Sequence, residues 1–356
     1  LINTFDLAFY PREKGPYNFT TTGINQSGQL IQPQKAWGGL MRNIDQTDFE
    51  STNIEFIEFW MQDPFVLKPN SKGGELYFNL GNISEDVLRD GKRQYENGLP
   101  TLTQPNVPVD ETAWSIIPRN PIQVTNAFSN DPADRPYQDV GFDGATDTAE
   151  RRKFAPYLNQ LSGVVGSTSP AYQKAANDPS ADNFRGYRDP SYGDVAGILE
   201  RYKDINNPHG NSPIASAKDE YTNAFTLYPD QEELNRDNTL NEVEEYFQYR
   251  VELKPNMQVG SNFITDVRNV TVKLANGTVR NEKWYLFRIP VTEYQAKVGN
   301  IPDFKSIRFI RMFLTNFEDT AVMRFAKLEL VRNQWRKFTY EINTTGTYTP
   351  LPVNDP

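Results

Sequence analysis

The sequence predicts a mainly β protein: two antiparallel, jelly-roll-like β-sandwiches that flank an irregular, partly helical segment. Three observations indicate this class. Apolar and polar residues alternate near both ends of the chain, Tyr and Phe are abundant, and 25 prolines and 22 glycines favour turns. We expect the first sandwich over residues 1–125, the irregular segment over 126–235, the second sandwich over 236–340 and an extended tail over 341–356.

Two strands are expected in the first sandwich, at 51–60 (STNIEFIEFW) and 74–83 (GELYFNLGNI). In the second run Leu76, Phe78 and Leu80 share one face, which is the period of a half-buried strand. The first run is apolar at both alternating positions, which predicts a central strand covered on both sides.

The second sandwich is expected to contain a hairpin. Residues 270–274 (VTVKL) alternate, the pair Asn276-Gly277 favours a type I′ turn because both of its central residues need a positive φ, and 282–291 (EKWYLFRIPV) returns. Two further strands are expected at 305–316 and 321–331.

The two β-rich ends also resemble each other. The segment DFESTNIEFIEFW (48–60) aligns with DFKSIRFIRMFL (303–314) when one or two residues are inserted, and both begin with Asp-Phe-x-Ser. This similarity predicts two structurally related units. We expect the strand around Phe309 to be central and buried on both faces.

Short helices are expected in the irregular segment, which is rich in Asn, Asp, Pro, Ser and Tyr. The candidates are 148–154, 169–178, 194–204 and 231–237. A loop-rich stretch of this length in a compact protein is typical of functional segments or of segments wrapped over another surface.

The bulk composition excludes several classes of protein. A net charge of −9 argues against nucleic acid as a partner, and the absence of cysteine excludes disulfides and thiol catalysis. The chain has no apolar run long enough for a membrane helix, and it starts without a signal-peptide pattern. We therefore expect a soluble protein, either a mature chain or a piece of a longer one.

Residues 139–150 (DVGFDGATDTAE) have the ligand spacing of a twelve-residue calcium loop. Such a loop supplies oxygen ligands at alternate positions, ends in a Glu and turns at a central Gly, here Gly144. Gly141 stands where a further side-chain ligand would be. The expected calcium ligands are Asp139, Asp143, the carbonyl of Ala145, Asp147 and Glu150. The alternative is an acidic turn before a helix, capped by Asp147 or Thr148.

Enzymatic sites find little support in the sequence. His209 is the single histidine and stands in the turn-like segment NNPHGNSP, where it is expected to be exposed. A Ser-His-Asp triad or a histidine metal cluster would depend on it. A glycosidase needs two carboxylates, but nothing marks a pair among Glu55, Glu58, Glu242 and Glu244. We therefore expect no enzyme.

Jelly-roll domains can bind carbohydrates, so exposed tryptophans matter. Trp60 and Trp284 lie inside strand patterns and are expected in the core, whereas Trp37, Trp114 and Trp335 are possible contact residues. A pair of cell-surface carbohydrate-binding modules is therefore the alternative function.

Four unusual strings carry a resemblance to a known family. They are NTFDLAFYPREKGPYNF (3–19), WGGLMRNIDQTDFESTNIEFIEFWMQDPF (37–65), GELYFNLGNISEDVLRDGKRQYENGLP (74–100) and YQDVGFDGATDTAE (137–150). These strings resemble the SprA/Sov family, the outer-membrane translocon of the type IX secretion system of Bacteroidetes, which is also tied to gliding motility.

The resemblance implies a protein-secretion function without catalytic residues. The family protein is a large transmembrane β-barrel with soluble insertions, and this chain would be one of those insertions. It would shape the entrance, exit or cap of the pore and contact other translocon subunits or secreted cargo. Its expected place is the cell-surface side of the outer membrane, where millimolar calcium suits a calcium loop. The alternative is the periplasmic side.

Overall fold

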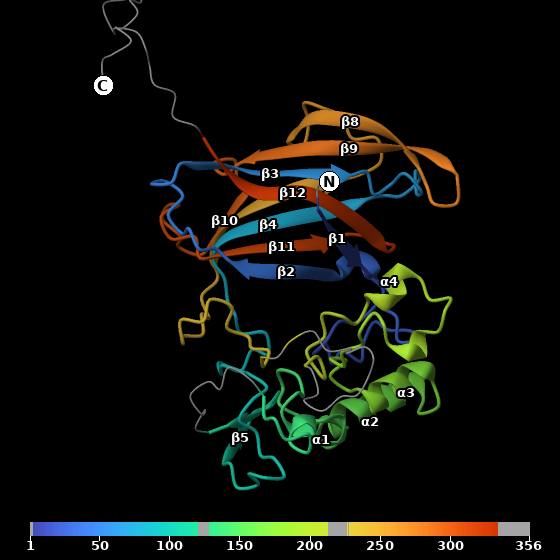
Figure 1. Cartoon of the computed structure of the whole chain (residues 1–356), viewed down its shortest axis with the longest axis vertical. Coiled ribbons are helices and arrows are strands. Elements are labelled where there is room, and N and C mark those ends of the chain that lie inside the picture. The colour runs from blue at the N-terminus through green and yellow to red at the C-terminus, as the bar shows by residue number, and fades with distance from the viewer. Residues whose placement is uncertain (1–2, 120–127, 213–225, 227, 334–356) are drawn as a thin grey trace, which may run out of the picture.

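The computed structural model describes residues 3–119, 128–212, 226 and 228–333. Two five-stranded antiparallel sheets lie above a loop-rich, partly helical layer in Figure 1. The prediction of a mainly β, antiparallel fold is confirmed. Within the described ranges, no helix has the length and apolar character needed to cross a membrane. The tail 341–356 and Trp335 lie outside the described residues.

One sheet has the strand order β1-β12-β3-β9-β8, and the other has the order β10-β7-β4-β11-β2. The strands of the first sheet are β1 (Thr4–Phe9), β12 (Ala321–Arg332), β3 (Ile54–Gln62), β9 (Val279–Pro290) and β8 (Ile264–Lys273). Those of the second are β10 (Ala296–Val298), β7 (Glu245–Leu253), β4 (Gly74–Asn82), β11 (Phe309–Thr315) and β2 (Trp37–Asn43).

Both β-rich ends of the chain contribute strands to both sheets, so the two separate sandwiches expected at 1–125 and 236–340 do not form. Strand β3 lies between β12 and β9, and β4 lies between β7 and β11. An alternating pattern specifies which face of a strand is buried, but it does not specify the partner strand. The pairing therefore depended on how the whole chain packs.

The similarity between the two ends has a structural counterpart. Strands β1, β2, β3 and β4 of the first half correspond, in this order, to β7, β9, β11 and β12 of the second half. When each strand in the order β1-β12-β3-β9 is exchanged for its counterpart, the result is β7-β4-β11-β2. This is the order of the second sheet without its edge strand β10. Each half of the chain thus supplies two strands to each sheet. The related units interlock within one sandwich, and β8 and β10 are additional edge strands.

The faces between the two sheets form one hydrophobic core. The ring centroids of Phe59 on β3 and Phe78 on β4 lie 5.5 Å apart and connect the two sheets. Leu76, Phe78 and Leu80 are completely buried, as the alternation predicted. Phe309 is buried too, at the start of β11.

The outer faces of the central strands are only half covered. Buried and half-buried positions alternate along β3 and β11, so the prediction of burial on both faces is wrong. Trp60 and Trp284 are half-buried for the same reason and do not lie in the core. A strand can be central in its sheet and still present one face to solvent, because antiparallel sheets tolerate one wet face.

The hairpin between β8 and β9 forms with a different turn from the expected one. The Gly277 N–H donates to the Leu274 carbonyl, and the Leu274 N–H donates to the Thr278 carbonyl. Gly277 has φ 83°, but Asn276 is not among the residues with positive φ. This pattern is a turn followed by a left-handed glycine, as in three-residue hairpin loops. A type I′ turn would need positive φ at both Asn276 and Gly277.

Among the described residues, the layer below the sandwich contains four α-helices: α1 (Asp147–Lys153), α2 (Ala155–Val165), α3 (Pro170–Asn177) and α4 (Ile198–Arg201). It also holds the short strands β5 (Val109–Glu111) and β6 (Ile116–Pro118). The helices expected at 148–154 and 169–178 are confirmed, that at 194–204 is reduced to one turn, and that at 231–237 does not form. Helix α2 was missed, although Leu158, Leu161 and Val165 recur at helical spacing.

Candidate functional site

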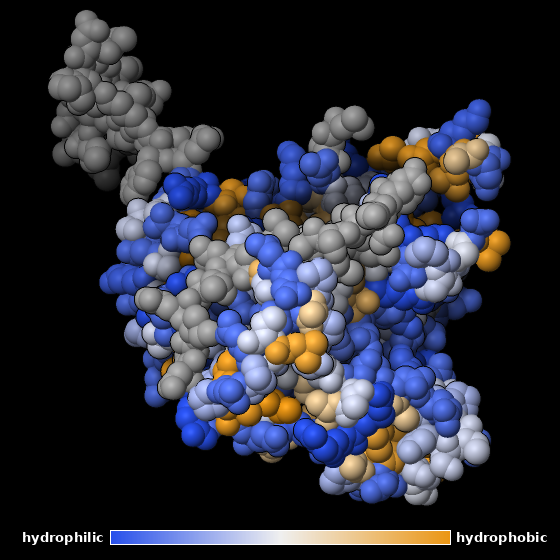
Figure 2. Space-filling view, turned by 60° about the horizontal axis from the view of Figure 1, so that its bottom comes forward, coloured by the Kyte–Doolittle hydropathy of each residue, from blue (hydrophilic) through white to orange (hydrophobic). Residues whose placement is uncertain are grey.

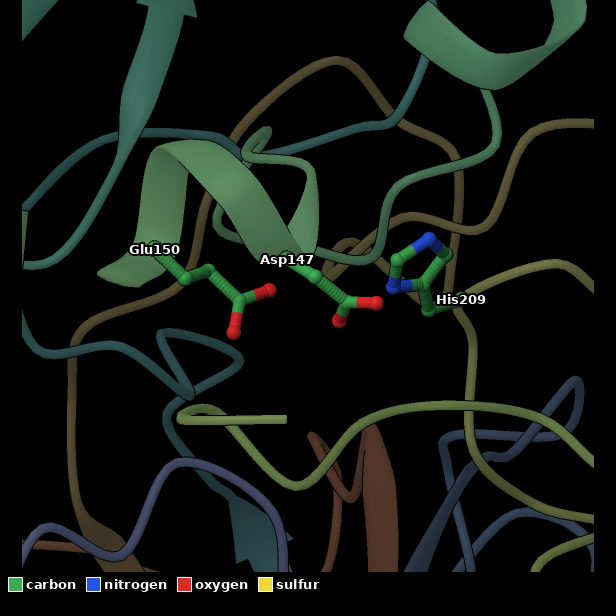
Figure 3. A group of neighbouring side chains, drawn as sticks. All are labelled: Asp147, Glu150 and His209. Carbon is green, nitrogen blue, oxygen red and sulfur yellow. The ribbon is translucent and has the colours of Figure 1, made fainter. Parts of the chain in front are cut away.

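Three fully buried carboxylates meet in the loop-rich layer: Asp143, Glu150 and Asp182. Each offers a ligand oxygen, and these atoms lie within 4.8 Å of one another. Asp143 precedes α1, Glu150 belongs to α1, and Asp182 lies in the loop after α3. A second group, Asp147, Glu150 and His209, shares Glu150 with the first (Figure 3).

Helix α1 positions two of these side chains. Thr146 is its N-cap, because the Oγ1 atom accepts a hydrogen bond from the Ala149 N–H at 3.3 Å. The expected caps, Asp147 or Thr148, are therefore wrong by one or two positions. Asp147 and Glu150 follow one helical turn apart, so both side chains leave the same side of the helix, as Figure 3 shows.

Ser180 holds the first two carboxylates. Its Oγ atom donates to Asp143 Oδ2 at 2.6 Å, and its backbone N–H donates to Glu150 Oε2 at 2.9 Å. The Ala145 N–H donates to Asp143 Oδ1 at 2.9 Å. The loop after α3 is thus tied to α1 and to the turn before it through two carboxylates.

Asp182 accepts one side-chain hydrogen bond and faces the histidine. The Tyr17 hydroxyl donates to Asp182 Oδ2 at 2.9 Å. His209 Nδ1 lies 3.6 Å from Asp182 Oδ1, which is beyond hydrogen-bond distance. Three buried atoms of this cluster have no hydrogen-bond partner within the described part of the chain: Glu150 Oε1, Asp182 Oδ1 and His209 Nδ1.

Burial and the repulsion between neighbouring carboxylates shift the pKa values of the side chains in this cluster. Burial, reinforced by Asp182 and Glu150, raises the pKa of Asp143 well above its usual range. Burial, reinforced by Asp182, raises the pKa of Glu150 to about 8. Burial lowers the pKa of His209, but the carboxylates of Asp182, Asp147 and Glu150 together outweigh that effect, and the net pKa is raised. Such a cluster is stable when its carboxyls are protonated or when a cation neutralises them.

Asp139, the first expected calcium ligand, has a different role in the structure. Its Oδ1 accepts the N–H groups of Gly210 and Asn211 at 3.1 and 3.2 Å, and its Oδ2 accepts the Ser212 N–H at 3.0 Å. The carboxylate therefore holds the loop that carries His209. The predicted twelve-residue loop does not bring its first acid to the carboxylate cluster.

The remaining expected ligands divide between the two groups. Asp143 and Glu150 are together, Asp147 lies with His209, and Ala145 supports Asp143 through its N–H. The sequence reasoning missed Asp182, since no spacing rule connects it to residues more than thirty positions earlier. The prediction of an exposed His209 is wrong, because only 16% of its side chain is exposed.

Other buried carboxylates organise the rest of the layer by accepting backbone N–H groups. Glu232 accepts those of Val87 and Leu88 at 2.9 Å and that of Gln94 at 3.1 Å. Glu96 similarly accepts the N–H of Gly141 at 3.0 Å, next to the cluster. These carboxylates join segments far apart in the sequence, where the chain offers few ladder hydrogen bonds.

A second feature is a strip of aromatic rings on the outer face of the β10-β7-β4-β11-β2 sheet. Phe313 on β11 stacks on Tyr77 of β4 with ring centroids 4.8 Å apart, and Trp37 on β2 packs edge-on against Phe313 at 6.5 Å. Trp37 is 66% exposed. The strip combines two half-buried, stacked rings with one prominent indole.

Comparison with known proteins gives one family. The SprA_N family model, described as "Motility related/secretion protein", matches residues 156–354, more than half of the chain. The match begins in α2 and includes all strands from β7 to β12. A comparison with curated proteins finds no match.

Proposed function

Because this chain belongs to the SprA_N family of motility-related and secretion proteins, we propose that it is a non-enzymatic module of the type IX secretion translocon. Its role is to shape the entrance, exit or cap of the protein-conducting pore and to contact components of the secretion system. The family match is the observation that carries this proposal. The four strings at 3–19, 37–65, 74–100 and 137–150 add support from a part of the chain that lies entirely outside the match.

The scaffold suits a steric role. We infer that the sandwich is a jelly roll, since eight of its ten strands, those other than β8 and β10, divide equally between the two sheets and the two halves of the chain interlock. Apart from the edge strands β8 and β10, every neighbouring pair of strands in the two sheets joins a strand from one half of the chain to a strand from the other half. A rigid support of this kind can hold loops in a fixed position, and loops on a rigid scaffold are where binding usually occurs.

A small apolar patch in the loop-rich layer is the best contact surface for a partner. Figure 2 brings this layer forward and shows small hydrophobic areas among mostly hydrophilic residues. Val195 and Ile198 are 97% and 73% exposed, and Leu199 and Tyr202 beside them are exposed as well. Four neighbouring exposed apolar side chains in and around α4 are costly in water unless another surface covers them. We define these four residues as the α4 patch.

The test replaces the α4 patch by serine in the full-length protein, in cells of a Bacteroidetes host. Export of type IX cargo is expected to fall, while the level of the variant in the outer membrane stays at that of the wild type. A matched control replaces Val259 and Val279, which are exposed apolar residues of the sandwich. Normal cargo export in the patch variant would show that this surface has no part in secretion.

We also propose that the module lies on the cell-surface side of the outer membrane. The periplasmic side is the alternative. Biotinylation of lysines in intact cells distinguishes the two, because a membrane-impermeant reagent reaches only the outer side. Lys72 is a suitable reporter, since its side chain is 77% exposed. Labelling only after cell lysis would place the module in the periplasm.

Carbohydrate binding is the second candidate function, and the aromatic strip of Trp37, Phe313 and Tyr77 is the observation that favours it. Sugar rings stack on exposed indole faces because their C–H groups are apolar. A glycan array with the wild type and Trp37→Ala is the test. Saturable binding that disappears in the variant would support this function over the steric one.

A further inference from the structure

We propose that Asp143, Glu150 and Asp182 bind one divalent cation, and that this cation is Ca²⁺. The site differs from the twelve-residue loop expected from the sequence, because its third carboxylate comes from the loop after α3 and Asp139 is not a ligand. The proposal is independent of the secretion role and of the α4 patch.

Unpartnered oxygens in completely buried side chains are the first argument. Glu150 and Asp182 are both 0% exposed, yet Glu150 Oε1 and Asp182 Oδ1 have no hydrogen-bond partner in the described part of the chain. The second oxygen of each carboxylate is held, by the Ser180 N–H and by the Tyr17 hydroxyl. Each carboxylate is thus fixed through one oxygen and keeps the other free, which is how a ligand is oriented for a metal.

Charge is the second argument. Among the ion pairs of the described residues, the one that involves this cluster joins His209 to Asp182. No arginine or lysine of the described residues forms an ion pair with Asp143, Glu150 or Asp182. Three buried carboxylates in mutual contact are strongly unfavourable unless they are neutralised. One divalent cation at their centre neutralises most of this charge.

The geometry fits a calcium ion. Ca²⁺ binds oxygens at roughly 2.3–2.6 Å, so one ion can connect oxygens up to about 5 Å apart. The ligand atoms of the three carboxylates lie within 4.8 Å of one another. Carboxylate oxygens suit a hard cation, and irregular loops suit Ca²⁺ better than Mg²⁺, which requires a near-ideal octahedron. Zn²⁺ would favour histidine and cysteine ligands.

Bound calcium would join three segments of the loop-rich layer: the turn before α1, helix α1 and the loop after α3. The ligands in these segments are residues 143, 150 and 182, so the ion would cross-link parts of the chain that are far apart in the sequence. The cluster sits beside the loop that Asp139 holds and beside the Gly141 N–H that Glu96 accepts. Calcium would therefore stabilise the whole layer beneath the sandwich.

The experiment uses the purified 356-residue chain and two readouts. Tb³⁺ is the first probe, because a nearby tyrosine sensitises its luminescence and the Tyr17 hydroxyl contacts Asp182. Excitation of tyrosine should give Tb³⁺ emission that Ca²⁺ displaces. Thermal unfolding is the second readout. At a free Ca²⁺ concentration 100-fold above Kd, the melting temperature should rise by about 4 °C over the value in chelator.

Substitutions assign the effect to the site. Asp182→Asn and Glu150→Gln should each abolish Tb³⁺ emission and the calcium-dependent rise. Asp139→Asn is the matched control, since it removes an acid of the same sequence segment without removing a ligand; its calcium-dependent rise should persist. In chelator, Asp182→Asn should melt at or above the wild type, because it removes uncompensated charge.

Four results would overturn the proposal. They are the absence of both Tb³⁺ emission and a calcium-dependent rise in the wild type, a rise that persists in Asp182→Asn and Glu150→Gln, loss of the rise in Asp139→Asn alone, and stabilisation by Zn²⁺ but not by Ca²⁺. Circular dichroism confirms that each variant is folded, and the two ligand variants provide independent tests should one of them fail to fold.

Discussion

The backbone N–H of Phe49 donates to the carbonyl of Phe304 at 2.9 Å. These phenylalanines belong to the two Asp-Phe-x-Ser segments, at 48–51 and 303–306, that make the ends of the chain similar in sequence. The Ile307 N–H donates to the Thr47 carbonyl at the same distance. The related segments therefore contact each other where the two halves of the sandwich meet.

Phe49→Ala should destabilise the whole sandwich. Phe49 is 1% exposed and belongs to the core, so its removal leaves a cavity between the halves. The expected loss in the free energy of unfolding is roughly 3–5 kcal/mol. Chemical denaturation measures this loss. Leu67→Ala, at a 72% exposed position, is the control and should change stability by less than about 0.5 kcal/mol. Equal stability of both variants would contradict the central position of Phe49.

Gly141→Ala should disturb the carboxylate cluster. Gly141 has φ 77°, and a Cβ atom at this position would collide with Asp182 Oδ2. The expected loss in the free energy of unfolding is roughly 2–4 kcal/mol, from backbone strain and displacement of Asp182. Thermal unfolding measures it. Gly163→Ala is a matched control inside α2, where the new Cβ meets nothing within 4 Å. That control should gain roughly 0.5–1 kcal/mol.

Glu232→Ala should open the segment 87–94 locally and leave the sandwich folded. The change removes the acceptor of three backbone N–H groups, and an unsatisfied buried donor costs about 1–3 kcal/mol. Hydrogen exchange at Val87, Leu88 and Gln94 should accelerate, while exchange in β3 and β4 stays slow. Glu293→Ala, at an exposed position, should change neither region. Unaltered exchange at Val87 in the Glu232 variant would refute the conclusion that Glu232 holds this segment in place.

Stability in chelator should fall as the pH rises from about 4.5 to about 8. The pKa of Glu150 is about 8 in the fold, against 4.5 as its ordinary value. The folded protein therefore binds this proton more tightly than the unfolded chain. The stability from Glu150 is complete below pH 4.5 and is lost as the pH rises through 8. The loss is about 1.4 kcal/mol per unit of pKa difference.

Denaturation at a series of pH values, all in chelator, tests this dependence. Burial also raises the pKa of Glu232 to about 8 and that of Asp230 to about 6, so both add to the same slope. Glu150→Gln should retain their contribution and show a shallower slope than the wild type. An identical slope in both proteins would mean that Glu150 is already ionised in the folded state at low pH.

Local sequence determined the strands β3, β4, β8, β9, β11 and β12, the buried face of β4 and some of the helices. The alternation of Leu76, Phe78 and Leu80 gave the face of β4, and the repeated Asp-Phe-x-Ser lead-in revealed two related halves. These features depend on neighbours along the chain, because side chains in a strand alternate with a period of two. Asp143 and Glu150 were identifiable as candidate ligands because both lie in one short segment, where their spacing along the chain could be compared with that of a calcium loop.

Tertiary structure alone decided which strands pair and which acids meet. The halves interlock because β3 finds β12 and β9 rather than a partner from its own end. Asp182 joins Asp143 and Glu150 because Ser180 binds both carboxylates and so brings the loop after α3 against α1. Asp139 does not join the carboxylate cluster, because its carboxylate accepts backbone N–H groups of residues 210–212 instead. Each outcome depends on contacts between residues remote in sequence, and neither periodicity nor spacing records such contacts.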